Sequence, residues 1–286
     1  MSDIVLSLFT GISTASLLFL VGAGMSLIFG AMRVINLAHG SFYMLGAYGI
    51  YEISTRLGVP VVVAIPLAAG AVYLLAMLVE WAIMRRTYGK EHLLQLLATY
   101  ALVLIFADLA LLIWGTTARS VTPPVSGSWS FFGVQLPAYR SLVILTAVVV
   151  GVVLWALLTK TRLGWMIRAG SENPSTLQAI GYNVPLLNTL IFGLGGALAG
   201  LGGAIYAPTG AVAPGLDNAI LIEAFVVAVV GGLGSIYGAA VIALLIGLLE
   251  GIVLLFAPDL SSSLVYIIMI VALGVRPWGL FGTPER

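Results

Sequence analysis

Residues 219–256 read AILIEAFVVAVVGGLGSIYGAAVIALLIGLLEGIVLLF, and this stretch decides the fold class. A helix that crosses the roughly 30 Å hydrocarbon core of a membrane needs about 20 apolar residues. The stretch is much longer than that, and the glycine-rich residues 231–234 interrupt it. Backbone groups in lipid must hydrogen-bond within their own segment, which excludes open strands. The pattern therefore predicts two consecutive membrane helices, one on each side of residues 231–234.

The rest of the chain is also strongly hydrophobic. Hydrophobic residues make up 61% of the 286 residues and charged residues 8%, whereas soluble domains carry about 25% charged residues. Most of the surface must therefore face lipid rather than water. Apolar runs of helical length lie near 4–30, 38–54, 59–84, 93–114, 140–159, 187–206, 219–230, 235–256 and 262–276. The sequence predicts an all-α fold, a polytopic transmembrane helix bundle of about eight to ten spans, with residues 1–286 forming a single transmembrane domain.

Basic residues indicate the orientation of the bundle. The third, fifth and ninth runs are followed by Arg85, Arg86, Lys90, Lys160, Arg162, Arg168, Arg276 and Arg286. Nine crossings place all of them on one side, and cytoplasmic loops carry an excess of Lys and Arg. We therefore expect a cytoplasmic C-terminus and an N-terminus outside. The loop 115–139, with Arg119 and Arg140 near its ends, is then an extracytoplasmic connector. Glu80 is expected to reach the cytoplasmic interface, five residues before Arg85.

Several functional classes are excluded by what the sequence lacks. It contains no cysteine, and its two histidines, His39 and His92, leave little material for a metal cluster. No G-x-x-x-x-G-K-[ST] loop is present, so the chain does not hydrolyse ATP by that route. The twelve basic residues form no patch for nucleic acid. We expect no catalytic residue, metal or cofactor in this chain.

The polar segment 160–186 predicts a short helix on the cytoplasmic side. Asn173 is a good N-cap, Pro174 suits the first helical position, and Gly181 supplies a left-handed stop. The predicted helix is 174–180, about two turns long.

One face of this short helix is apolar, because Leu177 and Ile180 lie three residues apart. Two interpretations remain open. The helix docks a cytosolic protein through these side chains, or it is an interfacial helix that lies on lipid.

A second motif is IFGAMRVINLAHGSFYMLGAYGIY at residues 28–51. Arg33, Asn36 and His39 are spaced three apart, which places them on one flank of a helix. Polar groups beside a span face protein or a water-filled cavity. The motif is either a broken helix that lines a transport pathway or a plain cytoplasmic turn. The pathway candidates here are Asn36, His39, Gly40 and Tyr43.

The third motif, VVGGLGSIYG at residues 229–238, leaves 219–230 too short to cross a membrane comfortably. Such interruptions are typical of half-helices near a transport path, although a tight hairpin explains them as well. Gly231, Gly232 and Gly234 are the pathway candidates in this motif. Elsewhere, glycines four residues apart, such as Gly247 and Gly251, predict close contacts between helices.

Three segments carry a family resemblance: SLIFGAMRVINLAHGSFYMLGAY (26–48), GWMIRAGSENPSTLQAIGYN (164–183) and AFVVAVVGGLGSIYGAAVIALLIGLLEG (224–251). In this order they resemble the branched-chain amino acid ABC permease family of the LivH type. The resemblance covers roughly residues 15–60 and 160–282, while the part between them fits only in hydropathy.

The resemblance implies an ABC importer permease architecture and a set of partners. These are a related second permease subunit (or a second copy of this chain), two cytosolic ATPase subunits that bind ATP and Mg, and an extracytoplasmic solute-binding protein. It also implies a multi-pass protein of a bacterial or archaeal inner membrane. Ala179 and Gly181 match the alanine and glycine of the family's coupling helix, whereas Asn173-Pro174 and Thr176 depart from its usual residues and leave the exact ATPase open. The residues expected to couple to the ATPase are Pro174, Leu177, Ala179, Ile180 and Gly181.

The predicted function is therefore the permease subunit of an ATP-driven importer for branched-chain or related amino acids, or similar small organic solutes. A competing class is a secondary transporter or channel that uses Asp108, Glu223 or Glu250 as a proton relay, since none has a basic partner in its own span. A membrane scaffold without transport fits the hydropathy but leaves the glycine breaks unexplained. Because the pathway candidates offer hydrogen bonds without a fixed charge pair, we expect selectivity mainly in the solute-binding protein.

Overall fold

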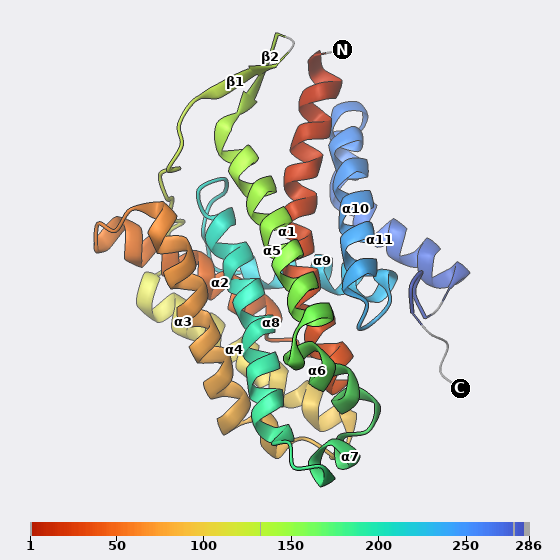
Figure 1. The fold of residues 1–286 in the computed structure, drawn as a ribbon. Helices are drawn as coiled ribbons and strands as arrows, with labels where there is room; N and C mark the ends of the chain where they lie inside the picture. The colour runs from red at the N-terminus through yellow and green to blue at the C-terminus, as the bar shows by residue number, and fades with distance from the viewer. Residues whose placement is uncertain (1, 132, 277, 283–286) are drawn as a thin grey trace.

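The computed structural model describes residues 2–131, 133–276 and 278–282, and helices dominate it. Within these residues, six helices are long and apolar enough to cross a membrane. They are α1 (Ser2–Met32), α3 (Val61–Ala82), α4 (His92–Trp114), α5 (Ala138–Lys160), α8 (Val184–Tyr206) and α10 (Ile236–Phe256). Figure 1 shows them arranged as one bundle. The predicted all-α membrane fold is confirmed.

Three further helices coincide with predicted runs but are shorter than the six spanning helices. They are α2 (His39–Ile50), which the π-helix η1 (Tyr51–Arg56) continues, α9 (Leu216–Gly231) and α11 (Pro258–Val275). The predicted count of about eight to ten spans is therefore above the six found. The difference arises because hydropathy detects an apolar environment, which a short helix inside a bundle shares with a full span.

Both α2 and α9 begin inside the bundle. The ring of His39, the first residue of α2, is fully buried and its Nε2 lies 2.9 Å from the Val21 carbonyl in the middle of α1. Asp217 in the first turn of α9 is 1% exposed. A Cβ added at Gly40 would clash with the backbone carbonyl of Asp217, so the two helix starts are in direct contact. The first turns of these two short helices therefore meet within the protein.

Close backbone approach between helices explains many glycines. A Cβ at Gly247 would lie 2.6 Å from the Ala15 amide nitrogen of α1, and one at Gly24 would lie 2.7 Å from the Gly195 carbonyl of α8. Without a hydrophobic force between helices in lipid, such small-residue contacts are a main source of packing energy. The predicted close contact at Gly247 and Gly251 is confirmed.

The bundle has two distinct ends (Figure 1). The antiparallel strands β1 (Ser128–Phe131) and β2 (Val134–Pro137) lie at the end that also holds the N-terminus, which we call the hairpin end. The helices α6 (Arg162–Glu172) and α7 (Pro174–Ala179) lie at the opposite end, which we call the α7 end. The short 3-10 helix η2 (Met84–Arg86) follows α3 and carries two arginines to the α7 end.

Candidate functional site

A cavity of about 320 Å³ opens among α1, α2, α8, α9 and α10, with the first turn of α5 beside it. Its three charged residues are Arg140, Glu223 and Glu250. Arg140 is in the first turn of α5, and Glu250 lies two turns before the end of α10. Both positions are near the hairpin end. The remaining wall consists of Ser13, Thr14, Leu17, Leu18, Tyr43, Tyr206, Thr209, Gly210, Leu216, Ala219 and Ile220.

The charged groups of this cavity come from three separate helices. Glu223 of α9 and Glu250 of α10 are close enough to interact electrostatically. The ion pairs Arg56–Glu52 and Arg85–Glu80 involve neither of them nor Arg140. Ionisable side chains within a membrane protein are costly and usually face a water-filled cavity or a functional site. The three groups therefore remain available to a molecule that enters the cavity.

Tyr43 also lines this cavity. Its side chain is 2% exposed, and its ring lies 5.8 Å from that of Tyr206, centroid to centroid. Helix α2 presents it from the middle of the bundle because Gly203 of α8 leaves room for the Tyr43 backbone. Tyr43 is thus the one sequence-derived pathway candidate found on the cavity wall.

The other candidates of the second motif hold the start of α2 in place. Asn36 is buried, and its Oδ1 accepts a hydrogen bond of 3.1 Å from the Ala38 amide. The ring of His39 contacts α1, and Gly40 packs on the backbone of α9, as described above. These contacts give Asn36, His39 and Gly40 a packing role, and their place on a transport pathway stays a prediction.

The candidates of the third motif form a compact connection between α9 and α10. A Cβ at Gly231 would lie 2.7 Å from the Gly238 carbonyl carbon, and one at Gly234 would lie 2.8 Å from the Gly30 Cα of α1. Gly232 and Gly234 have φ angles of 97° and 90°, which favour glycine. Helix α9 is short and a tight turn follows it, as the interruption in the sequence predicts. A pathway role for Gly231, Gly232 and Gly234 stays a prediction.

The segment at the α7 end folds much as the sequence predicts. Helix α7 begins after Asn173, whose Oδ1 accepts a hydrogen bond of 3.0 Å from the Thr176 amide, and Pro174 is the first helical residue. Gly181 follows with a φ of 95°. Pro174, Ala179 and Gly181 are exposed.

The expected apolar docking patch on α7 is half wrong. Leu177 is 2% exposed, whereas Ile180 is 61% exposed. Leu177 packs in a cluster with Ile167 of α6 and Leu187 of α8, so it anchors α7 to the rest of the chain. The two residues lie on one side of the helix axis, but only Ile180 is available to a partner.

The expectation that Glu80 reaches the cytoplasmic interface is wrong. Glu80 is fully buried, accepts a hydrogen bond of 3.0 Å from the Tyr88 hydroxyl, and also accepts one from Thr189 of α8. Arg85 lies 3.5 Å from its carboxylate and donates a hydrogen bond of 2.6 Å to Thr189. The carboxylate is buried because this network satisfies it, and the network ties α3 to α8 next to the α7 segment.

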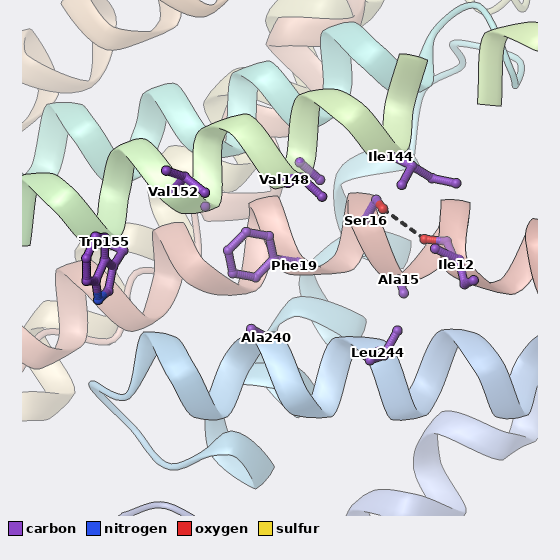
Figure 2. Close-up of a pocket in the computed structure, with 12 residues that line it drawn as sticks. Ile12, Ala15, Ser16, Phe19, Ile144, Val148, Val152, Trp155, Ala240 and Leu244 are labelled. Carbon is purple, nitrogen blue, oxygen red and sulfur yellow. Dashed lines mark hydrogen bonds between the residues drawn. The ribbon is translucent and has the colours of Figure 1, made fainter. Parts of the chain in front are cut away.

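A second hollow, of about 390 Å³, lies among α1, α5 and α10 (Figure 2). Figure 2 shows Ile144, Val148 and Val152 of α5 facing it across Phe19 of α1. None of its lining residues is charged, and the hydroxyl of Ser16 already donates to the Ile12 carbonyl at 2.8 Å. This groove therefore offers a solute no charged group, in contrast to the charged cavity.

Comparison with known proteins decides the family. The model of the family described as "Branched-chain amino acid transport system / permease component" matches residues 7–273. The chain belongs to this family. The expected resemblance is thereby confirmed, and this permease matches the family across its middle part as well.

Individual relatives agree. This permease is 26% identical to the high-affinity branched-chain amino acid transport system permease protein BraD of Pseudomonas aeruginosa, over 97% of the chain and 95% of that protein. It is 29% identical to the probable branched-chain amino acid transport permease protein LivH of Methanocaldococcus jannaschii, over 94% and 89%. Over 84 residues (29% of the chain and 25% of that protein) it is 38% identical to the nucleoside ABC transporter permease protein NupC of Lactococcus lactis subsp. cremoris. No solved structure matches it.

Sequence reasoning missed the grouping of charges in this permease. It left Glu223 and Glu250 without a basic partner and treated Arg140 as a loop residue, whereas the structure places all three on one cavity. The third acidic candidate, Asp108, is exposed on α4 and lies outside the cavity. Helical spacing within one segment carries no signal for contacts between α5, α9 and α10. An arginine in the first turn of one helix and lone carboxylates in two others were the available hints.

Proposed function

We propose that this permease is the membrane subunit of an ATP-driven importer that moves branched-chain amino acids, or similarly small organic solutes, across a bacterial or archaeal inner membrane. The observation that carries the proposal is α7, a capped helix at the end of the bundle that holds the basic loops. Its outer surface is exposed, and its one buried side chain, Leu177, fastens it to α6 and α8. The chain belongs to a family of transport permeases.

In this proposal, α7 transmits movement from a separate ATPase to the bundle. Leu177 lies in one cluster with Leu187 and Ile191 of α8, so a displacement of α7 moves the start of α8. Helix α8 packs on α2 through Gly203, and α2 carries Tyr43 on the cavity wall. Packed elements of this kind move as units with discrete arrangements. A mechanical connection therefore leads from the α7 end to the charged cavity.

The proposed assembly has four kinds of component. ATP and Mg bind to two cytosolic ATPase subunits, and solute arrives on an extracytoplasmic binding protein at the hairpin end. A related second permease subunit, or a second copy of this chain, completes the membrane part. The orientation follows from Arg85, Arg86, Lys160 and Arg168, which lie in segments at the α7 end and favour the cytoplasmic side.

One observation favours a second candidate function. Glu223 and Glu250 share a cavity, and carboxylates within a bundle serve as proton relays in secondary transporters. A transporter of that class works without an ATPase. The two candidates therefore differ in whether a cytosolic ATPase binds to the α7 end.

The test is co-purification of the ATPase with variants of the permease. Ile180→Asp is expected to reduce the ATPase recovered at least tenfold, because an interface that buries Ile180 would then bury an unpaired carboxylate. Leu57→Asp is the matched control, because Leu57 is an equally apolar residue that is exposed beyond η1, away from the α7 segment. Undiminished recovery with Ile180→Asp would contradict docking at α7. Absence of any co-purifying ATPase would favour the second candidate.

A further inference from the structure

The charged cavity is suited to more than the passage of a solute. We propose that Glu223, Glu250, Arg140 and Tyr43 form a binding site within the permease for a zwitterionic α-amino acid, with the ammonium group held by the two carboxylates and the solute carboxylate held by the arginine. This inference rests on the proposed function, whose solute class it specifies. It makes the permease itself a selector, in contrast to the expectation that selectivity lies mainly in the binding protein.

The first argument is charge. Two carboxylates and one guanidinium line the same cavity, and each is partly accessible from it. In the part of the chain that the structure describes, no hydrogen bond or ion pair of the protein engages these three side chains. A zwitterion supplies an ammonium group for the carboxylates and a carboxylate for the guanidinium, whereas a solute without charged groups supplies neither. An ammonium group has three donors and can be shared by both carboxylates, and a guanidinium can hold a carboxylate with two parallel hydrogen bonds.

The second argument is Tyr43, which is independent of the charges. Its side chain is almost wholly buried, yet it lines the cavity, and its hydroxyl makes no hydrogen bond with the described residues. The hydroxyl is accessible from the cavity rather than sealed within the protein, so it can donate a hydrogen bond to a bound solute or accept one from it. Tyr43 and Glu223 line the same cavity and are close enough to interact electrostatically.

The third argument is size and position. A volume of about 320 Å³ is at the small end of the range for ligand pockets, roughly 300–1,000 Å³. Leu17, Leu18 and Ile220 supply apolar wall for a solute side chain. Thr209 and Gly210 line the cavity from the loop after α8, which lies toward the hairpin end (Figure 1). This is the side from which a binding protein would deliver solute.

The test is equilibrium binding of radiolabelled L-leucine to the purified full chain in detergent, up to about 10 mM. Two competitors each lack one charge: leucinamide lacks the carboxylate, and 4-methylpentanoate lacks the ammonium group. Wild-type chain is expected to bind leucine saturably and at least tenfold more tightly than either competitor. This assay needs no ATPase, so it can fail or succeed independently of ATP-driven transport.

Three variants assign the charges. Glu223→Gln and Glu250→Gln keep the side-chain shape and are each expected to weaken leucine binding at least tenfold. Arg140→Gln is expected to remove the preference for leucine over leucinamide, while Arg140→Lys keeps most of it because the positive charge remains. Asp108→Asn, on the exposed side of α4, is the control and should leave binding unchanged. Elution volume in size-exclusion chromatography verifies that each variant is folded.

The outcomes separate clearly. Leucine binding that is unchanged in all three cavity variants would overturn the proposal, as would equal binding of leucine and 4-methylpentanoate. Absence of saturable binding to a folded wild-type chain would also overturn it, even if the assembled transporter imports leucine. The proposal is supported if leucine binding is lost in the two glutamate variants and the preference for leucine over leucinamide disappears in Arg140→Gln.

Discussion

Replacement of Gly203 by alanine tests the contact that positions the cavity wall. Gly203 lies in α8 where α2 crosses it, and the added methyl group would overlap the Tyr43 carbonyl oxygen. It would also lie 2.8 Å from the Tyr43 carbonyl carbon and 3.1 Å from the Ala47 amide nitrogen. All three atoms belong to the backbone, so no side-chain rotation relieves the clash. Helix α2 has to move away from α8.

The magnitude follows from two opposing effects. Overpacking of a well-packed interior costs typically 1–3 kcal/mol. Alanine in place of glycine within a helix contributes about 0.5–1 kcal/mol of stability. We therefore expect Gly203→Ala to lower the free energy of unfolding by about 1–2 kcal/mol. Gly70→Ala in α3 is the matched control, because nothing lies within 4 Å of its added Cβ. It should gain up to about 1 kcal/mol.

The assay is thermal unfolding of the purified chain in detergent, followed by the loss of the monodisperse peak. Gly203→Ala should unfold a few degrees below wild type and Gly70→Ala at or above it. If Gly203→Ala proves as stable as Gly70→Ala, the packing of α2 on α8 described here is wrong. Leucine binding by the chain should weaken in Gly203→Ala as well, since Tyr43 moves with α2.

Three further substitutions test other contacts. Glu80→Ala should lower the free energy of unfolding by about 1.5–3 kcal/mol, because the hydroxyls of Tyr88 and Thr189 lose their charged acceptor while Arg85 stays partly exposed to water. Glu91→Ala, on the exposed surface, should change little in the same thermal assay. Leu177→Asp should abolish the folded peak in size-exclusion chromatography and Ile180→Asp should not, since only the first carboxylate is buried within the chain; equal peaks would contradict that difference. Tyr139→Phe should lower the free energy of unfolding by about 1 kcal/mol, because the Tyr139 hydroxyl donates a hydrogen bond of 2.9 Å to the buried Ile205 carbonyl. An unchanged unfolding temperature would show that this hydrogen bond does not stabilise the fold.

Local signals predicted much of this fold. The apolar runs 93–114 and 235–256 match α4 (His92–Trp114) and α10 (Ile236–Phe256) to within one residue. The cap at Asn173 placed α7 correctly, because capping depends on residues only three apart in sequence. In each case the information lies within the segment itself.

Contacts between distant segments were outside the reach of the same reasoning. The start of α2 depends on the Val21 carbonyl and on the backbone of Asp217, neither of which adjoins it in sequence. Helical spacing placed Leu177 and Ile180 on one face, yet burial of the first depends on residues of α6 and α8. The grouping of charges around the cavity depends in the same way on three helices that come together only in the folded bundle.

The proposed dependence on a separate ATPase is tested most directly by uptake of leucine into liposomes. One preparation contains the purified chain alone with an imposed proton gradient, and the other contains the chain with its second permease subunit, the ATPases, the binding protein and ATP-Mg. We predict uptake only in the second preparation, and its loss when ATP is omitted. Robust gradient-driven uptake by the chain alone would contradict the account and would identify a secondary transporter.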